Sequence, residues 1–312
     1  MKRWLCGLGL AAGLNAMAQT AASTPTAPPL PRPTEGRLER WAHFASQHVD
    51  ARPVDIWLPA NYSTAKRYAV VYMQDGQMLF DAQTTWNQQA WNVDQTVTRL
   101  VKAGRIPDLI VVAPHNNGKF RHSEYFPQQY LAGMPEPQRT RLLRDSLEGR
   151  PQSDAYLRFL VEELKPAVDA KYSTQPRRES TFVMGSSMGG LISVHAMNQY
   201  PQVFGGAAGL STHWMGGAEP NAAIPLAAFN HLRASLADPA THRLYQDHGT
   251  TELDALYAPY QVMVNDLARE RGYVETGATA NFMTRVFEGT GHNELAWASR
   301  LEIPLLFLFG KP

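Results

Sequence analysis

The sequence has very little cysteine, no long apolar run and almost no net charge. Its one cysteine, Cys6, lies in an N-terminal segment that we expect to be removed. The mature chain would then have no disulfide, no thiol nucleophile and no thiolate metal ligand. The chain has 29 Lys and Arg residues against 28 Asp and Glu residues, so its charge does not favour nucleic acid or an anionic membrane as a partner.

Positions 1–18 have the pattern of an export signal. Lys2 and Arg3 precede an apolar run over positions 4–14, and Ala16-Met17-Ala18 is the small-x-small pattern that precedes cleavage. A membrane anchor is the alternative, but the run is shorter than the roughly 20 helical residues that span a bilayer. We therefore predict a periplasmic or secreted protein without a membrane anchor, beginning near Gln19.

The rest of the chain divides into a short linker and one large domain. Residues 19–36 are rich in Ala, Thr and Pro, a composition typical of a tether. With 44% apolar residues in the chain, residues 37–312 are long enough to form one catalytic domain with a sizeable core.

Strands and helices are predicted to alternate through this domain. Apolar runs predict strands at 38–45, 54–58, 68–73, 107–114, 181–184, 202–211, 243–247 and 281–287. Helical patterns occupy 91–103, 154–172, 191–197, 222–236 and 253–271. This alternation predicts an α/β fold with a mostly parallel sheet and helices on both faces. Active sites in such sheets lie at the carboxyl ends of the strands.

A Gly-x-Ser-x-Gly pentapeptide, with Ser187 at its centre, lies between the strand at 181–184 and the helix at 191–197. A sharp strand-to-helix turn needs Gly185 and Gly189 because a Cβ at either flank would crowd its neighbours. The helix start behind it offers free N–H groups to an oxyanion, and Met188 is one expected donor. The alternative is a glycine-rich turn with a surface serine.

A second oxyanion donor is expected after the strand at 68–73. There Gly76 lets the backbone approach a ligand, and the N–H of Gln77 is well placed to bind an oxyanion. An ordinary strand-to-helix turn is an equally good interpretation of these residues.

Two further segments are candidates for the substrate cleft. The loop at 115–127 contains Arg121, Glu124 and Tyr125, and it either lines a cleft or is a solvated loop with an internal ion pair. His213 and Trp214 follow the strand at 202–211, where they either form a pocket wall or simply pack.

Position selects His292 as the general base. It follows the last strand directly, and Gly289 and Gly291 make its loop flexible enough to bring the imidazole to the serine. His248 is the closest competitor. His195, His231 and His242 fall in predicted helices or at a strand start, which favours structural roles.

Two carboxylates, Glu252 and Asp254, compete for the role of triad acid, which holds the histidine tautomer and stabilises the imidazolium. Thr251-x-x-Asp254 is also a possible capping box, in which Asp254 would only cap the following helix. The order of serine, acid and histidine is that of α/β hydrolases.

The chain resembles the putative-esterase group of α/β hydrolases, which includes enterochelin-esterase-like proteins, feruloyl and acetylxylan esterases and S-formylglutathione hydrolases. The motifs that carry the resemblance are YMQDGQMLFD from Tyr72, GSSMGG from Gly185, DHGTTELDALYAPYQ from Asp247 and GTGHNELAW from Gly289. The resemblance implies an α/β-hydrolase fold, a Ser-His-acid triad and neither metal nor organic cofactor. The enterochelin-esterase-like branch favours Asp254 as the acid, whereas the feruloyl type favours a position nearer Glu252.

The sequence thus predicts an exported serine esterase with Ser187, His292 and Asp254 as triad and Met188 and Gln77 as oxyanion donors. Its substrate would be a small-molecule or glycan ester, such as an acylated carbohydrate or a siderophore-type ester. Acyl transfer with the same residues and a catalytically silent hydrolase-fold binding protein are the alternatives. The sequence makes no prediction of oligomeric state.

Overall fold

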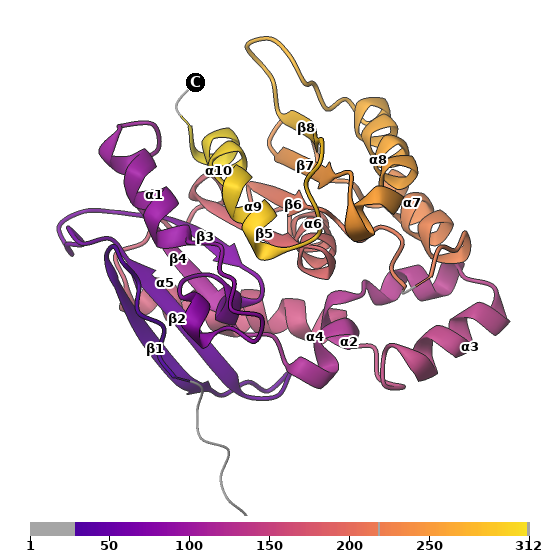
Figure 1. Cartoon of the computed structure of the whole chain (residues 1–312), viewed down its shortest axis with the longest axis horizontal. Helices are drawn as coiled ribbons and strands as arrows, with labels where there is room; N and C mark the ends of the chain where they lie inside the picture. Colours follow the sequence, from indigo (N-terminus) through magenta and orange to yellow (C-terminus); the bar gives the residue numbers. More distant parts are fainter. Residues whose placement is uncertain (1–28, 218, 311–312) are drawn as a thin grey trace, which may run out of the picture.

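A single sheet organises the protein, for which a computed structural model describes residues 29–217 and 219–310 (Figure 1). Its strands are β1 (Arg37–Phe44), β2 (Arg52–Leu58), β3 (Ala69–Met73), β4 (Leu109–Pro114), β5 (Thr181–Ser186), β6 (Gly206–Leu210), β7 (Arg243–Gly249) and β8 (Phe282–Phe287). They lie in the order β1-β2-β4-β3-β5-β6-β7-β8. The first two strands are antiparallel to their neighbours, and β3 to β8 run parallel.

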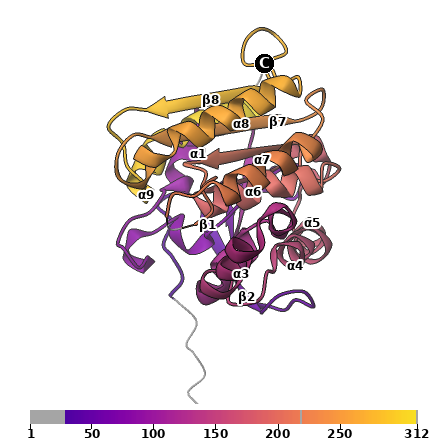
Figure 2. The same cartoon turned by 90° about the vertical axis from the view of Figure 1, so that its right-hand side faces the viewer.

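Helices cover both faces of this sheet. They are α1 (Val93–Lys102), α2 (Arg121–Tyr125), α3 (Glu136–Asp145), α4 (Ser153–Arg158), α5 (Lys165–Lys171), α6 (Met188–Gln199), α7 (Ala223–Ser235), α8 (Ala258–Glu270), α9 (Glu294–Arg300) and α10 (Glu302–Phe309). Alternate side chains of a strand point to opposite faces. In β3, Val70 and Tyr72 share a cluster with α4 to α8, whereas Val71 and Met73 share one with α1, α9 and α10. Figure 2 shows α6, α7 and α8 on the same side of the strands. The predicted fold class is therefore confirmed.

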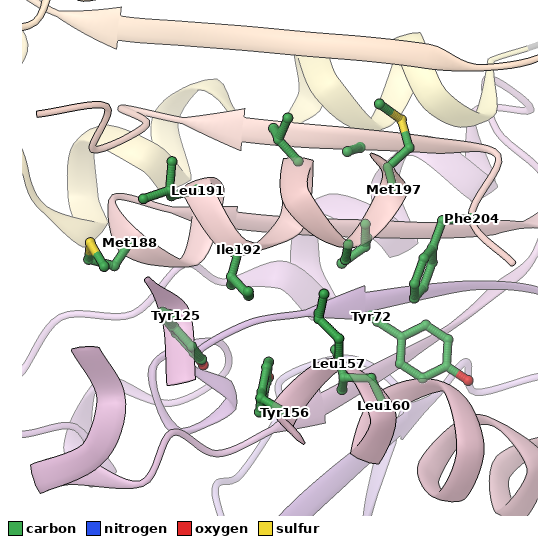
Figure 3. Packing of buried hydrophobic residues seen from close by; sticks show 14 of the residues in the cluster. Tyr72, Tyr125, Tyr156, Leu157, Leu160, Met188, Leu191, Ile192, Met197 and Phe204 are labelled. Atoms are coloured by element: carbon green, nitrogen blue, oxygen red, sulfur yellow. The ribbon is translucent and has the colours of Figure 1, made fainter. Parts of the chain in front are cut away.

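Helix α6 is apolar on nearly all sides, as a helix enclosed by other elements must be. Figure 3 shows its residues Met188 and Ile192 in the same apolar cluster as Tyr72 of β3 and Leu157 of α4. Such dense packing fixes the position of the helix and of the turn that precedes it.

The predicted helix at 154–172 is present, but its middle is a π-helical segment, Phe159–Leu164, between α4 and α5. Pro166 is the second residue of α5, two positions after the end of this segment. A proline lacks the N–H of a regular helix, and its ring would clash with the carbonyl four residues earlier, at Glu162. A wider π turn relieves that clash.

The predicted tether needs a correction at its C-terminal end. Positions 1–28, with the predicted signal, lie outside the described residues, but residues 29–36 lie against the domain without a helix or strand of their own. The backbone N–H groups of Thr34 and Glu35 donate to Asp94 Oδ2 at 2.7 and 3.1 Å, and the carbonyl of Glu35 accepts from Trp57 Nε1 at 2.7 Å. This stretch is bound because Asp94 is fully buried and needs donors.

A buried histidine in α6 should make the fold sensitive to acid. His195 is 1% exposed, and neither of its ring nitrogens has a hydrogen-bond partner in the described chain. Burial, with a smaller contribution from His231, lowers the pKa of His195 to about 3. The unfolded chain therefore binds a proton that the folded chain does not, so stability is lost as pH falls below about 6.5.

We expect His195→Leu to remove this loss. The stability advantage of the variant over the wild type should grow by about 2 kcal/mol between pH 8 and pH 5. Thermal unfolding of both proteins at the two pH values measures the difference, with the exposed His43→Leu as the matched control. An advantage of equal size at both pH values would contradict the assignment.

Candidate active site

The backbone at Ser187 is strained, as a sharp turn between β5 and α6 requires. Ser187 has φ 54° and ψ −125°, and α6 begins at the next residue, three positions earlier than the predicted helix. A Cβ on Gly185 would lie 2.6 Å from the carbonyl of Gly189. The steric reason expected for the flanking glycines is therefore present in the structure, whereas the neighbouring Ser186 ends the buried strand.

Two backbone N–H groups near this turn are free to bind an oxyanion. Met188 is the first residue of α6, so its N–H has no intrahelical acceptor. Neither this N–H nor that of Gln77 donates to any acceptor in the described chain. The turn that carries Gln77 touches the start of α6, because a Cβ on Gly189 would lie 3.1 Å from Asp75 Oδ2.

Asp75 explains how this second turn is held. It has a left-handed backbone, φ 56°, and its carboxylate accepts from Arg121 Nε at 2.7 Å and Nη2 at 2.8 Å. Gly76 is needed for packing within the sheet, since its Cβ would lie 2.2 Å from the carbonyl oxygen of Ala113 in β4. The turn therefore approaches the neighbouring strand closely, and the expected approach to a ligand stays a prediction.

The loop at 115–127 has no internal ion pair of the kind we considered. Arg121 pairs with Asp75, and Glu124 forms a buried ion pair with Arg52 of β2, with contacts of 2.5 and 2.7 Å. Both pairs join the loop to distant segments, so it is anchored beside the Gln77 turn.

The predicted base and acid are in direct contact. His292 Nδ1 lies 2.6 Å from Asp254 Oδ1, and Asp254 is 1% exposed. Asp254 lies in a short 3-10 helix, Glu252–Leu256, after β7, and Thr251 at its N-cap makes no side-chain capping bond. The capping-box alternative for Asp254 is therefore wrong. Glu252 instead accepts from the backbone N–H of His292 at 2.8 Å, so it holds the loop but not the imidazole.

The surroundings of Asp254 keep it ionised. Burial disfavours the charged carboxylate, but hydrogen bonds from His292, Ser211 and the Gly249 N–H outweigh it and lower the pKa of Asp254. The distances are 2.5 Å from Ser211 Oγ and 2.6 Å from the Gly249 nitrogen. An ionised Asp254 can only accept, so Nδ1 of His292 carries the proton and Nε2 keeps its lone pair.

Tyr257 lies between the serine and the two histidines His213 and His292. Burial, then the charge of Asp254, raises the pKa of Tyr257, and the Ser187 side chain opposes this rise. The Tyr257 hydroxyl lies 2.6 Å from His213 Nδ1, and its ring meets that of His292 edge to face with centroids 5.6 Å apart. No hydrogen bond joins Ser187 to His292 in the described chain. Catalytic hydrogen bonds are often loose in a free enzyme and tighten when substrate binds.

The remaining candidates have structural contacts. Burial, then the charge of His292, lowers the pKa of His213 to about 4, so it is neutral at pH 7. Trp214 is 1% exposed and packs in the core, and His248 lies in β7 with Nδ1 2.6 Å from the carbonyl oxygen of Gly249. The sequence reasoning did not find Tyr257, although it lies in the motif DHGTTELDALYAPYQ.

One cleft in the described chain is remote from this constellation. It has a volume of about 1030 Å³ and is lined by Arg178, Asp238, His242, Arg243 and Asn281, among others. These residues lie at or near the starts of β5, β7 and β8, whereas Ser187 follows the end of β5.

Within residues 29–217 and 219–310, no three His, Cys, Asp or Glu side chains are grouped to hold a metal ion. No helix in the same residues is long and apolar enough to span a bilayer.

The strand order and the likeness to known esterase structures show the α/β-hydrolase fold, in which Ser187 follows β5, Asp254 follows β7 and His292 follows β8. The chain belongs to the esterase family described as "Putative esterase", whose model matches residues 47–306. Membership in this family supports an enzyme that hydrolyses esters.

Comparison with individual proteins agrees with this family. The uncharacterized protein YjcH of Bacillus subtilis is 25% identical over 174 residues, which cover 55% of this chain and 60% of that protein. The structure is similar to a ferulic acid esterase, with TM-score 0.63, 18% identity and coverage of 89% of this chain and 99% of the other. It is also similar to the enterobactin esterase FES of Shigella flexneri, with TM-score 0.64, 17% identity and coverage of 89% and 60%. At these identities the structural likeness shows a shared fold.

Proposed function

We propose that the protein is an exported serine esterase that works through an acyl-enzyme. One observation carries this proposal: His292 Nδ1 lies 2.6 Å from Asp254 Oδ1. The two residues follow β8 and β7, which come after Ser187 in the chain. The protein thus has a histidine base with a fixed tautomer and a serine on a strained turn, and such an arrangement activates a serine hydroxyl.

In the proposed reaction, Ser187 Oγ attacks the ester carbonyl while its proton passes to His292 Nε2. The Met188 and Gln77 N–H groups donate to the oxyanion that forms, and the negative charge of Asp254 stabilises the imidazolium. His292 then gives the proton to the leaving alcohol. Water repeats the sequence on the acyl-enzyme and releases the acid.

For the substrate we propose an ester of an acylated carbohydrate or a siderophore-type ester. The names of two similar structures, a ferulic acid esterase and an enterobactin esterase, support these classes. A hydrolysis screen over short acyl, feruloyl and siderophore esters tests the choice between them. Hydrolysis of the short acyl esters alone would contradict both classes.

A fluorophosphonate separates the esterase from a silent binding protein of the same fold, since it reacts only with an activated serine. We expect covalent labelling at Ser187, located by peptide mass spectrometry. An unlabelled protein that still binds esters would contradict the proposed mechanism.

Export gives a prediction about the N-terminus. Because Ala16-Met17-Ala18 has the pattern that precedes cleavage, we expect protein from its native compartment to begin at Gln19 or a close neighbour. Mass spectrometry of the intact protein measures this. A cytoplasmic protein that retains Met1 would contradict the proposed location.

A further inference from the structure

Behind the triad acid lies a buried ion pair that the proposed reaction does not use. Arg300, the last residue of α9, has its Nη2 2.9 Å from Oδ1 of Asp247 in β7 and 3.9 Å from Asp254 Oδ2. The side chains of Arg300 and both carboxylates are at most 2% exposed. One guanidinium thus lies between two carboxylates in a region closed to water.

Ser211 connects this ion pair to the acid. Its hydroxyl accepts from Arg300 Nη2 at 2.8 Å and from Trp297 Nε1 at 2.9 Å, and it donates to Asp254 Oδ2 at 2.5 Å. A hydroxyl has one proton and two lone pairs, so all of its hydrogen-bonding capacity is used. The same Trp297 packs edge to face on His292, with ring centroids 5.0 Å apart. The middle of α9, at Trp297, therefore contacts the base, and its last residue, Arg300, lies beside the acid.

The charges of the cluster are matched to the proposed reaction. Asp247 also accepts from the Tyr245 hydroxyl at 2.8 Å and from the Ser211 N–H at 3.1 Å. With both carboxylates ionised and Arg300 positive, the cluster has one net negative charge. It becomes neutral overall when His292 takes the serine proton, which is when a compensating charge is needed.

We propose that Arg300 and Asp247 are positioning residues that set the charge experienced by the Asp254–His292 pair, with Ser211 as the connecting group. This inference rests on the proposed roles of Ser187 and His292. The ion pair balances the second carboxylate, so that His292 responds to one uncompensated negative charge and not to two or none. Burial raises the pKa of Asp247, and the charge of Arg300 opposes that rise without cancelling it.

The proposal predicts opposite effects for the two partners. Arg300→Met leaves two buried carboxylates without their cation, which favours the protonated form of His292. The acid limb of the pH–rate profile, where the rate falls because His292 is protonated, should then move to higher pH. Asp247→Asn keeps the shape of the side chain but removes one negative charge beside Arg300. The excess positive charge disfavours protonated His292, so the acid limb moves to lower pH. A shift of about half a pH unit or more is expected in each direction.

The other charged or titratable groups around His292 stay constant in this comparison. They are Asp254 and Glu252 from the 3-10 helix, Tyr257, His213 after β6 and Glu294 at the start of α9. Only the two partners of the buried ion pair are changed.

The experiment measures the rate of fluorophosphonate labelling at Ser187 from pH 4 to pH 9, which needs no knowledge of the natural substrate. The proteins are the wild type, Arg300→Met, Asp247→Asn and the double variant, whose limb should return toward the wild type. Arg285→Met and Glu288→Gln are the matched controls, since both residues are exposed and lie on or next to β8.

Two limbs that move in opposite directions support the proposal, because a merely structural defect would lower the rate without moving them apart. Limbs that stay in place, or that move the same way, would overturn it. If Arg300→Met does not fold, Asp247→Asn and the charge-preserving Arg300→Lys test the proposal instead. The acid limb should then move to lower pH in Asp247→Asn and stay in place in Arg300→Lys. A wild type that does not label at all would instead refute the proposed function.

Discussion

Replacing Ser187 by alanine is expected to remove nearly all ester hydrolysis, by a factor on the order of a millionfold. The reason is that the proposed acyl-enzyme forms on the Ser187 hydroxyl, so in the variant only the proposed oxyanion donors and the binding surface would contribute. Turnover of a responsive ester from the substrate screen, compared at equal concentrations of folded protein, measures the loss.

The neighbouring serine provides the control for this experiment. Ser186 is 5% exposed and ends β5, so Ser186→Ala should keep turnover close to the wild type. If Ser187→Ala retained a tenth of the wild-type rate, Ser187 would not be the nucleophile.

Replacing Asp254 by asparagine is expected to lower turnover by up to about ten-thousandfold. In the wild type, the Asp254 carboxylate accepts a hydrogen bond from His292 Nδ1, with 2.6 Å between the two atoms, and Nε2 keeps the lone pair for its proposed role as base. An amide can donate from its nitrogen to Nδ1, and this favours the tautomer in which Nε2 is already protonated. The fold should survive, since an amide has nearly the shape of a carboxylate.

Glu252→Gln is the matched comparison, because Glu252 lies two positions away and binds only the backbone N–H of His292. An amide oxygen can still accept that hydrogen bond, so turnover should stay within tenfold of the wild type. Turnover and thermal stability of the two variants, made separately, decide the assignment. A collapse for Glu252→Gln with little change for Asp254→Asn would make Glu252 the triad acid.

Local signals were sufficient to predict the main elements of the fold. Each predicted strand is present within a few residues, since short apolar runs bounded by turn residues leave few other interpretations. The start of α6 was predicted too late because the glycine-rich turn conceals that the helix begins at Met188. The π segment was also missed, although Pro166 could have indicated an irregular helix.

The site was predictable where one residue type at one position carries the chemistry, as at Ser187 and His292, whose roles remain predictions. The supporting contacts were not predictable, because each joins positions far apart in the chain. Ser211, for example, meets Asp254 from 43 positions away and Arg300 from 89. No spacing or composition links such residues, and only the parallel order of the strands brings them together.

The binding of Thr34 and Glu35 to Asp94 places the true edge of the folding unit before the first strand. The change in composition at residue 36 suggests that a shortened chain could begin at Arg37. Such a chain would leave the Asp94 carboxylate in α1 without its three donors from residues 34 and 35, and Trp57 without an acceptor. A buried carboxylate in that state destabilises the helix that carries it. The stretch that precedes β1 therefore stabilises α1 through Asp94, and a shortened chain should keep residues 34 and 35.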